Sequence, residues 1–107
     1  RYEHESAYLL AKGNVKRPGQ PVPDVIDMPY SGNKLHPTQK PVAALLPLVD
    51  TFCPASGLVL DPFCGSGSSL VAAQHLGRDW LGMELDVEHA ATATRRLAWH
   101  AAKKIAA

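Results

Sequence analysis

Apolar residues in the second half of the chain recur in two alternating patterns. Short apolar runs that end near glycine, proline or acidic residues predict buried strands over 58–61 and 80–85. Apolar residues at helical spacing predict helices over 42–52 and 66–76, and a last helix that begins after Asp86 and ends near residue 104. The order strand–helix–strand–helix predicts a right-handed βαβ unit with a helix before it and a helix after it.

The ends of these helices carry typical capping residues. The serines that open the helix at 66–76 are expected to cap its backbone N–H groups, and Gly77 is expected to take the left-handed conformation that ends it. Asp86 is expected to cap the last helix. Farther along that helix, we interpret Arg95 and Arg96 as part of a solvated face.

The first 41 residues follow a different pattern. Residues 7–11 are apolar and compact, which predicts a short extra strand that turns at 12–14. Six prolines follow between Val15 and Pro41. Because proline lacks a backbone N–H and has a fixed φ, this stretch is expected to be a long ordered loop or a linker.

These elements predict one α/β domain over residues 1–107, divided into a strand with a proline-rich loop (1–41) and a βαβα half (42–107). A parallel sheet needs both of its faces covered, and two strands with one short extra strand make a poor sheet. The chain is therefore expected to be half of a doubly wound fold with an incomplete sheet. Because it begins at Arg1 rather than methionine, the sequence is compatible with a fragment or a processed product.

Composition and charge exclude few classes of protein. The formal net charge of +1 is too small to indicate nucleic-acid binding by itself. No apolar stretch approaches the roughly 18–20 residues that span a bilayer, so no membrane partner is expected. Cys53 and Cys64 predict free thiols in a reducing cytoplasm. The histidines and cysteines lack zinc-ligand spacing, and no metal is expected.

A turn with two glycines follows the strand at 58–61, which ends in Asp61. This order is the geometry that holds a nucleotide-like cofactor over the end of a parallel sheet. The third glycine of the dinucleotide pattern is missing because residue 70 is leucine, which disfavours NAD. A carboxylate at Asp61 would repel phosphate but could pair with an ammonium group. A cofactor with a cationic amino-acid part and a nucleoside part, such as S-adenosylmethionine (SAM), fits better.

A second acidic residue, Glu84, follows Gly67 by 17 positions at the end of the second predicted strand. This is near the spacing at which an acid binds ribose hydroxyls, and Leu85 then offers an apolar side to an adenine ring. The alternative interpretation is that Asp61 and Glu84 simply mark strand ends and cap helices.

Three motifs in this order closely resemble those of one enzyme family. The chain contains His36-Pro-Thr-Gln-Lys-Pro41, then Asp61-Pro-Phe-Cys-Gly-Ser-Gly67, then Gly82-Met-Glu-Leu-Asp86. They resemble the motifs of DNA methyltransferases that modify adenine N6 or cytosine N4, in the β-type circular arrangement. The resemblance runs from about Tyr8 to Leu97. It implies a partial Rossmann-like methyltransferase fold, SAM as the cofactor and DNA as the partner.

The resemblance also implies roles for individual residues. Thr38 and Lys40 would reach the methionine carboxylate of the cofactor, with His36 ordering their loop. Glu84 would hold the ribose hydroxyls and Leu85 would flank the adenine. The turn that follows the first strand would frame the methionine end of the cofactor through Asp61, Phe63, Gly65, Ser66 and Gly67.

The catalytic element of that family, a short Asp/Ser/Asn-Pro-Pro-aromatic loop, is not found in this sequence. The nearest match, Asp27-Met-Pro-Tyr30, has methionine at its second position and lies where the family has a connector. The catalytic residues therefore stay unassigned, and adenine N6 and cytosine N4 both stay open as targets.

The leading interpretation is a site-specific, SAM-dependent DNA methyltransferase of a restriction-modification type, represented by its cofactor-binding part. One alternative is a truncated, non-catalytic SAM-binding or structural remnant, which could pair with a second copy through its exposed sheet edge. A third interpretation is a fragment of a nucleotide-binding oxidoreductase.

Overall fold

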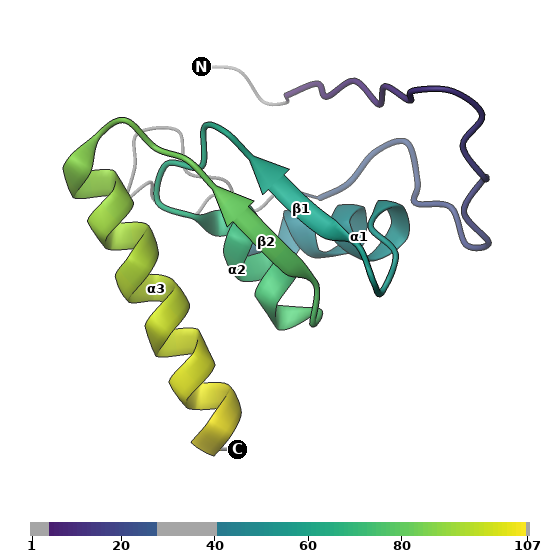
Figure 1. Ribbon diagram of the computed structural model, residues 1–107. Coiled ribbons are helices and arrows are strands. Elements are labelled where there is room, and N and C mark those ends of the chain that lie inside the picture. The colour runs from purple at the N-terminus through teal and green to yellow at the C-terminus, as the bar shows by residue number, and fades with distance from the viewer. Residues whose placement is uncertain (1–4, 28–40, 107) are drawn as a thin grey trace.

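The computed structural model describes residues 5–27 and 41–106 (Figure 1). It contains helix α1 (Val42–Phe52), strand β1 (Leu58–Asp61), helix α2 (Ser68–His75), strand β2 (Asp79–Gly82) and helix α3 (Val87–Ala106). The order and type of all five elements confirm the prediction for residues 42–104. Two elements are shorter than predicted, because α2 begins at Ser68 and β2 ends at Gly82. Glu84 therefore lies in the loop after β2 and not within the strand.

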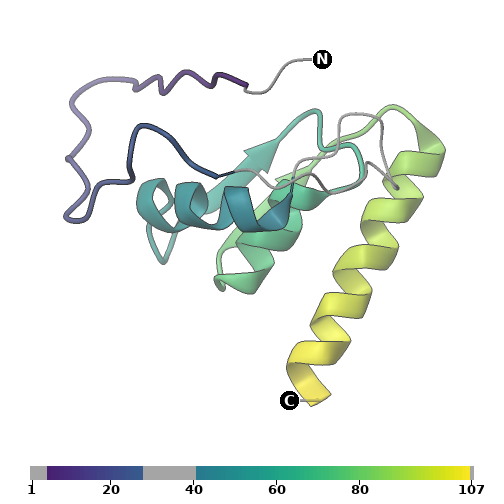
Figure 2. The ribbon, with the colours of Figure 1, turned by 180° about the vertical axis from the view of Figure 1, so that it is seen from behind.

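The two strands form a parallel sheet in which Leu58 pairs with Asp79 and Asp61 pairs with Gly82. Helices α1 and α2 lie against one face of this sheet, as the views from the front and from behind both show (Figures 1 and 2). Helix α2 also contacts α3, so it is the centre of the packing. The other face exposes about half of each of its leucines, Leu58, Leu60 and Leu81.

The core is built on α2 because that helix is enclosed on several sides. Leu70 and Val71 of α2 are buried and pack with Leu97 of α3, and the partly buried Val42 and Cys64 complete the cluster. Gly82 of β2 lies against this core. A Cβ at that position would collide with Leu70 Cδ1 and would lie 3.1 Å from Cys64 Sγ, so a side chain here would force these core side chains to move.

Two of the predicted caps are confirmed. Asp86 Oδ1 accepts hydrogen bonds from the backbone N–H groups of Glu88 (2.9 Å) and His89 (3.1 Å), which caps α3. Gly77 has a φ of 72°, the left-handed conformation predicted for the end of α2.

The prediction that serines cap α2 is wrong. The N-cap position is Gly67, with a φ of 88° and no side-chain hydrogen bond to the helix. The serine hydroxyls are engaged elsewhere, because Ser66 and Ser68 accept hydrogen bonds from Arg96 and Ser69 donates one to Asp61.

The predicted strand at residues 7–11 is also wrong. This segment has no regular secondary structure, and Tyr8, Leu9 and Leu10 are each at least 70% exposed. A strand is stabilised by hydrogen bonds to a neighbour, and within the described residues the sheet contains β1 and β2 alone. The short extra strand of the predicted fold is therefore not formed.

Arg78 joins the end of α1 to the start of β2. Its Nε donates to the carbonyl of Cys53 at 3.0 Å, and its Nη2 lies 3.3 Å from Asp50 Oδ1. A second branch, Nη1, donates to the carbonyl of Leu76 at 2.9 Å.

Among the described helices, none is both long and apolar enough to cross a membrane.

Candidate cofactor site

The candidate site lies where both parallel strands end, because the carboxyl ends of parallel strands meet at the same edge of a sheet. The segments that follow β1 and β2 stay hydrogen-bonded to each other beyond the regular strands. The N–H of Met83 donates to the carbonyl of Asp61 at 2.9 Å, and the N–H of Cys64 donates to the carbonyl of Met83 at 3.0 Å. The turn after β1 and the turn after β2 are therefore held side by side.

Asp61 shapes the turn after β1. Its Oδ1 accepts a hydrogen bond from the backbone N–H of Phe63 at 3.0 Å, and its Oδ2 accepts one from the hydroxyl of Ser69 in the first turn of α2. One carboxylate thus binds both ends of the connection between strand and helix. This bonding agrees with the alternative interpretation of Asp61 as a turn-forming residue, and it also holds the carboxylate in one place.

Glu84 joins the two turns. Its Oε1 accepts a hydrogen bond from the N–H of Gly65 at 2.9 Å, and its Oε2 accepts one from the N–H of Asp86 at 2.8 Å. The hydrogen bond from Asp86, followed by the one from Gly65, lowers the pKa of the Glu84 carboxyl below its ordinary value. The side chain is therefore an ionised acceptor at neutral pH.

Two glycines between β1 and α2 take conformations that other residues rarely adopt. Gly65 has a φ of 54° and Gly67 a φ of 88°. Gly67 also lies against α3, where a Cβ would come within 2.9 Å of the Cβ of Ala93. We call residues 65–67 the glycine loop. All three of its residues are buried.

Cys64 precedes the glycine loop as a half-buried thiol. Burial raises its pKa, and the negative charges of Asp61 and Glu84 raise it further. A thiol that is kept protonated is a poor nucleophile, so the surroundings of Cys64 favour a packing role.

Two apolar side chains extend from these turns into solvent. Phe63 after β1 is 87% exposed and Leu85 after β2 is 100% exposed. Both are among the residues that the sequence assigned to the cofactor, and both are available to a ligand. His36, Thr38 and Lys40 lie outside the described residues, as do the last three residues of the Asp27–Tyr30 segment.

Comparisons with known proteins identify the family of this chain. The model of a DNA methylase family, the N6/N4 type, matches residues 4–95. The chain belongs to the N6/N4 DNA methylase family. The predicted family and the predicted α/β methyltransferase fold are thereby confirmed.

Individual methylase relatives are considerably longer than this chain. YubD of Escherichia coli (strain K12) is 50% identical over 97 residues, which cover 91% of this chain and 43% of YubD. The type II methyltransferase M.HinfI of Haemophilus influenzae is 36% identical over 66 residues, covering 62% of this chain and 18% of that protein. The chain therefore spans less than half the length of either relative.

Two solved structures with similar folds contain the predicted cofactor. The M1.HpyAVI–SAM complex matches with a TM-score of 0.56 and 38% identity, over 57% of this chain and 32% of that one. TTHA0409 of Thermus thermophilus, complexed with S-adenosyl-L-methionine, matches with a TM-score of 0.54 and 40% identity, over 56% of this chain and 25% of that one.

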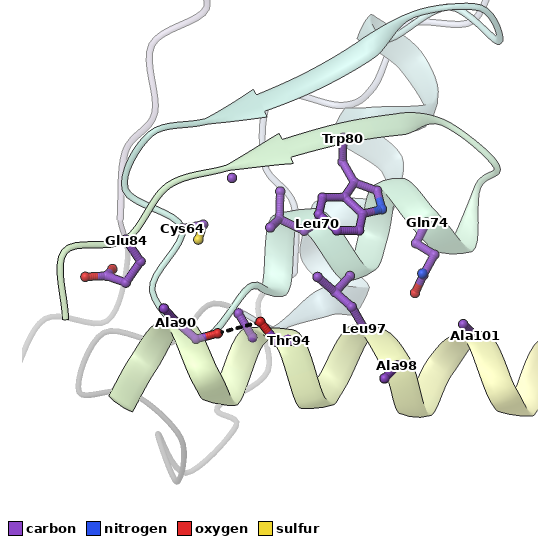
Figure 3. Close-up of a pocket in the computed structure, with 12 residues that line it drawn as sticks. Cys64, Leu70, Gln74, Trp80, Glu84, Ala90, Thr94, Leu97, Ala98 and Ala101 are labelled. Atoms are coloured by element: carbon purple, nitrogen blue, oxygen red, sulfur yellow. Dashed lines mark hydrogen bonds between the residues drawn. The ribbon is translucent and has the colours of Figure 1, made fainter. Parts of the chain in front are cut away.

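The chain also has an open groove between α3 and the α2–β2 side of the fold, with a volume of about 390 Å³. Figure 3 shows Glu84 and Cys64 at the end of the groove nearest the glycine loop, and Gln74 and Ala101 at the other end. Trp80, Leu70 and Leu97 line its middle. The groove is mostly apolar and continues away from the candidate cofactor site.

Arg96 is the residue near the site that the sequence interpretation placed wrongly. It was expected on a solvated face with Arg95, but only Arg95 is exposed. The guanidinium of Arg96 is half-buried and donates hydrogen bonds to Ser66 and Ser68. The one available signal was its position three residues after Ala93, on the apolar face of the predicted helix.

Proposed function

We propose that this chain is the cofactor-binding part of a SAM-dependent DNA methyltransferase that modifies an exocyclic amine, adenine N6 or cytosine N4. The observation that carries the proposal is the ionised Glu84 carboxylate, bound to the N–H of Gly65 at the shared carboxyl end of two parallel strands. An acidic acceptor beside a glycine turn is the arrangement that binds the ribose of a nucleoside cofactor.

The chemistry of the described residues fits SAM. Each oxygen of Glu84 holds one backbone N–H and keeps a second lone pair, so the carboxylate can also accept hydrogen bonds from ribose hydroxyls. Asp61 provides a negative charge for an ammonium group and would repel a pyrophosphate. Exposed Phe63 and Leu85 provide apolar surface for the methionine chain and the adenine.

The remaining cofactor assignments come from the HPTQKP motif. Thr38 and Lys40 are proposed to hold the methionine carboxylate, and His36 to order their loop. Gly65, Ser66 and Gly67 are proposed to frame the methionine end, where the absence of a side chain at Gly65 would let a ligand approach the backbone.

When bound, SAM supplies a sulfonium methyl group that is already reactive toward an amine. The described residues of this chain then bind and orient it, and we assign none of them a catalytic role. The target base would be flipped out of the duplex to reach the methyl group. The relative M.HinfI, a type II methyltransferase, supports a setting in restriction-modification, and we propose a cytoplasmic location together with the DNA.

Isothermal titration of the purified chain with S-adenosylhomocysteine and with SAM tests the cofactor assignment. We expect weak binding that is lost in Glu84→Gln and kept in Glu88→Gln, since exposed Glu88 is a matched acid on α3. Binding of NAD in place of SAM would support the oxidoreductase interpretation. No binding of either SAM compound at millimolar ligand would contradict the proposal.

A second candidate is a non-catalytic remnant that pairs with another copy, through the face of its sheet and not through the sheet edge that the sequence suggested. The supporting observation is the half-exposed leucine face of the sheet, because exposed contiguous apolar surface favours association. Sedimentation equilibrium of the wild type and of Leu60→Lys tests the pairing. Incorporation of tritiated methyl from SAM into DNA by the purified chain, above background, would contradict the remnant interpretation.

A further inference from the structure

Arg96 extends from α3 to the side of the glycine loop that faces this helix. Its Nη1 donates to the carbonyl of Ser66 at 2.9 Å, to the hydroxyl of Ser66 at 3.2 Å and to the hydroxyl of Ser68 at 3.1 Å. Two of these acceptors belong to Ser66 in the glycine loop, and the third belongs to Ser68, the first residue of α2. Both serines are nearly inaccessible to solvent.

The burial of this guanidinium makes its hydrogen bonds important. Burial lowers the pKa of Arg96, yet an arginine stays charged at neutral pH. None of the described carboxylates pairs with it, so oxygen dipoles of the loop segment take the place of a counter-ion. A charge that is partly shielded from water is costly when it has no partners. Any loop conformation that withdraws the Ser66 and Ser68 oxygens from Arg96 is therefore disfavoured.

The contacts of Arg96 fix one particular peptide group. The carbonyl of Ser66 and the N–H of Gly67 belong to the same peptide plane. The carbonyl accepts from Arg96, and the N–H donates to the carbonyl of Cys64 at 2.8 Å. The plane between Cys64 and Gly65, two peptide groups earlier, is also held on both sides, because its carbonyl accepts that bond and its N–H donates to Glu84 at 2.9 Å.

A second contact from α3 supports the first. Ala93 lies one turn before Arg96 on the same face of the helix. It packs closely on Gly67, because a Cβ added at Gly67 would lie 2.9 Å from the Cβ of Ala93. Helix α3 thus closes the back of the glycine loop by packing and by hydrogen bonding. Glu84 holds the loop from the turn after β2.

We infer that Arg96 is a positioning residue that fixes the conformation of the glycine loop and thereby sets its affinity for the cofactor. The part about affinity rests on the proposed SAM site, whereas the part about loop conformation does not. Arg96 is expected to act through Ser66 and Ser68, without touching the ligand.

The experiment compares Arg96→Met and Arg96→Lys with Arg95→Met, a matched control on the same helix whose side chain is exposed. Two-dimensional ¹H–¹⁵N spectra follow the amides of Gly65 and Gly67, and titration with S-adenosylhomocysteine gives Kd. In Arg96→Met we expect both glycine amides to shift and Kd to rise on the order of tenfold, the effect of losing a charge-assisted hydrogen bond. Arg96→Lys, which keeps the charge, should recover part of both effects.

Several results decide the inference. Glycine amides and a Kd in Arg96→Met that match those of Arg95→Met would overturn it. If Arg96→Met fails to fold, the same two readouts in Arg96→Lys replace it, and wild-type values there would also overturn it. If the wild type does not bind S-adenosylhomocysteine but the amides of Arg96→Met still shift, the proposed function fails while the role of Arg96 in loop conformation is supported.

Discussion

The carboxylate of Glu84 accepts a hydrogen bond from the backbone N–H of Gly65, 19 residues earlier in the chain, at 2.9 Å. This contact joins the turn after β1 to the turn after β2, and the second oxygen of Glu84 joins it to the start of α3 through Asp86. The residue proposed to hold the ribose therefore also builds the site. Protonation of Glu84 should therefore weaken both the binding of the cofactor and the stability of the fold.

Acid should weaken the folded chain partly through Glu84. The pKa of this carboxyl lies below its ordinary value near 4.5, because backbone N–H groups favour its ionised form. A group whose pKa is lowered by folding adds stability that is present above its ordinary pKa and is lost as the pH falls through the lowered one. We expect the free energy of unfolding to fall below pH 4.5 less steeply in Glu84→Gln than in the wild type.

Urea unfolding at a series of pH values from neutral down through the ordinary carboxyl range measures this dependence. Glu88→Gln removes a comparable acid from the exposed side of α3 and serves as the control, with a profile expected to follow the wild type. Identical slopes for the wild type and Glu84→Gln would show that Glu84 is not ionised preferentially in the folded state.

Alanine substitutions at two left-handed glycines separate backbone strain from packing. Gly67 (φ 88°) lies against Ala93, whereas a Cβ at Gly77 (φ 72°) would meet nothing within 4 Å. Gly77→Ala should cost only the strain of the left-handed conformation, about 1–2 kcal/mol. Gly67→Ala should cost this strain and a further roughly 1–3 kcal/mol for overpacking.

Thermal and urea unfolding give the two costs. The double variant Gly67→Ala/Ala93→Gly should recover part of the packing cost, since it removes the colliding methyl group. Equal destabilisation by Gly67→Ala and Gly77→Ala would mean that α3 yields easily at this contact.

The sequence predicted the helices and strands of residues 42–104 well, because their signals are local. Periodicity placed α1, β1 and α3, and the capping role of Asp86 follows from its position before a helix. Prediction from the sequence failed where a partner distant in the chain decides whether an element forms. Residues 7–11 have strand-like composition but no neighbour to pair with within the described fold.

Arg96 shows the same limit for side chains. A charged residue next to another on a helix is usually solvated, and Arg95 is. The approach of α3 to the glycine loop half-buries Arg96 and brings it to its hydrogen-bond acceptors. These are oxygens of serines 28 and 30 positions earlier in the chain. The same contact removes the serines from their predicted capping role.

The contact of Gly82 with α2 predicts a packing defect on substitution. A Cβ in Gly82→Ala would collide with buried Leu70 and crowd Cys64, so we expect a loss of about 1–3 kcal/mol. Gly19→Ala is the control, because a Cβ at Gly19 would meet nothing within 4 Å. Near-wild-type urea unfolding for Gly82→Ala would mean that Leu70 changes rotamer without cost.

Arg78 should stabilise the fold mainly through the carbonyl groups that it binds. Helix α1 has no basic residue in its last turn, and Arg78 approaches its C-terminal end from beyond α2. A cation at this end of a helix satisfies the last carbonyls and interacts favourably with the helix dipole. Arg78→Met should therefore lower the free energy of unfolding by about 1–3 kcal/mol.

Asp50→Asn distinguishes these carbonyl contacts from the ion pair. The side chain of Asp50 is 65% exposed, so its 3.3 Å pair with Arg78 is expected to contribute only about 0–1 kcal/mol. Urea unfolding of Arg78→Met and Asp50→Asn compares their losses of unfolding free energy. The amide of Cys53 donates to the carbonyl of Val49, so its hydrogen exchange reports on the end of α1. We expect faster exchange in Arg78→Met alone. Equal losses in the two variants would instead assign the stabilisation to the exposed ion pair, with the carbonyl groups of Cys53 and Leu76 contributing little.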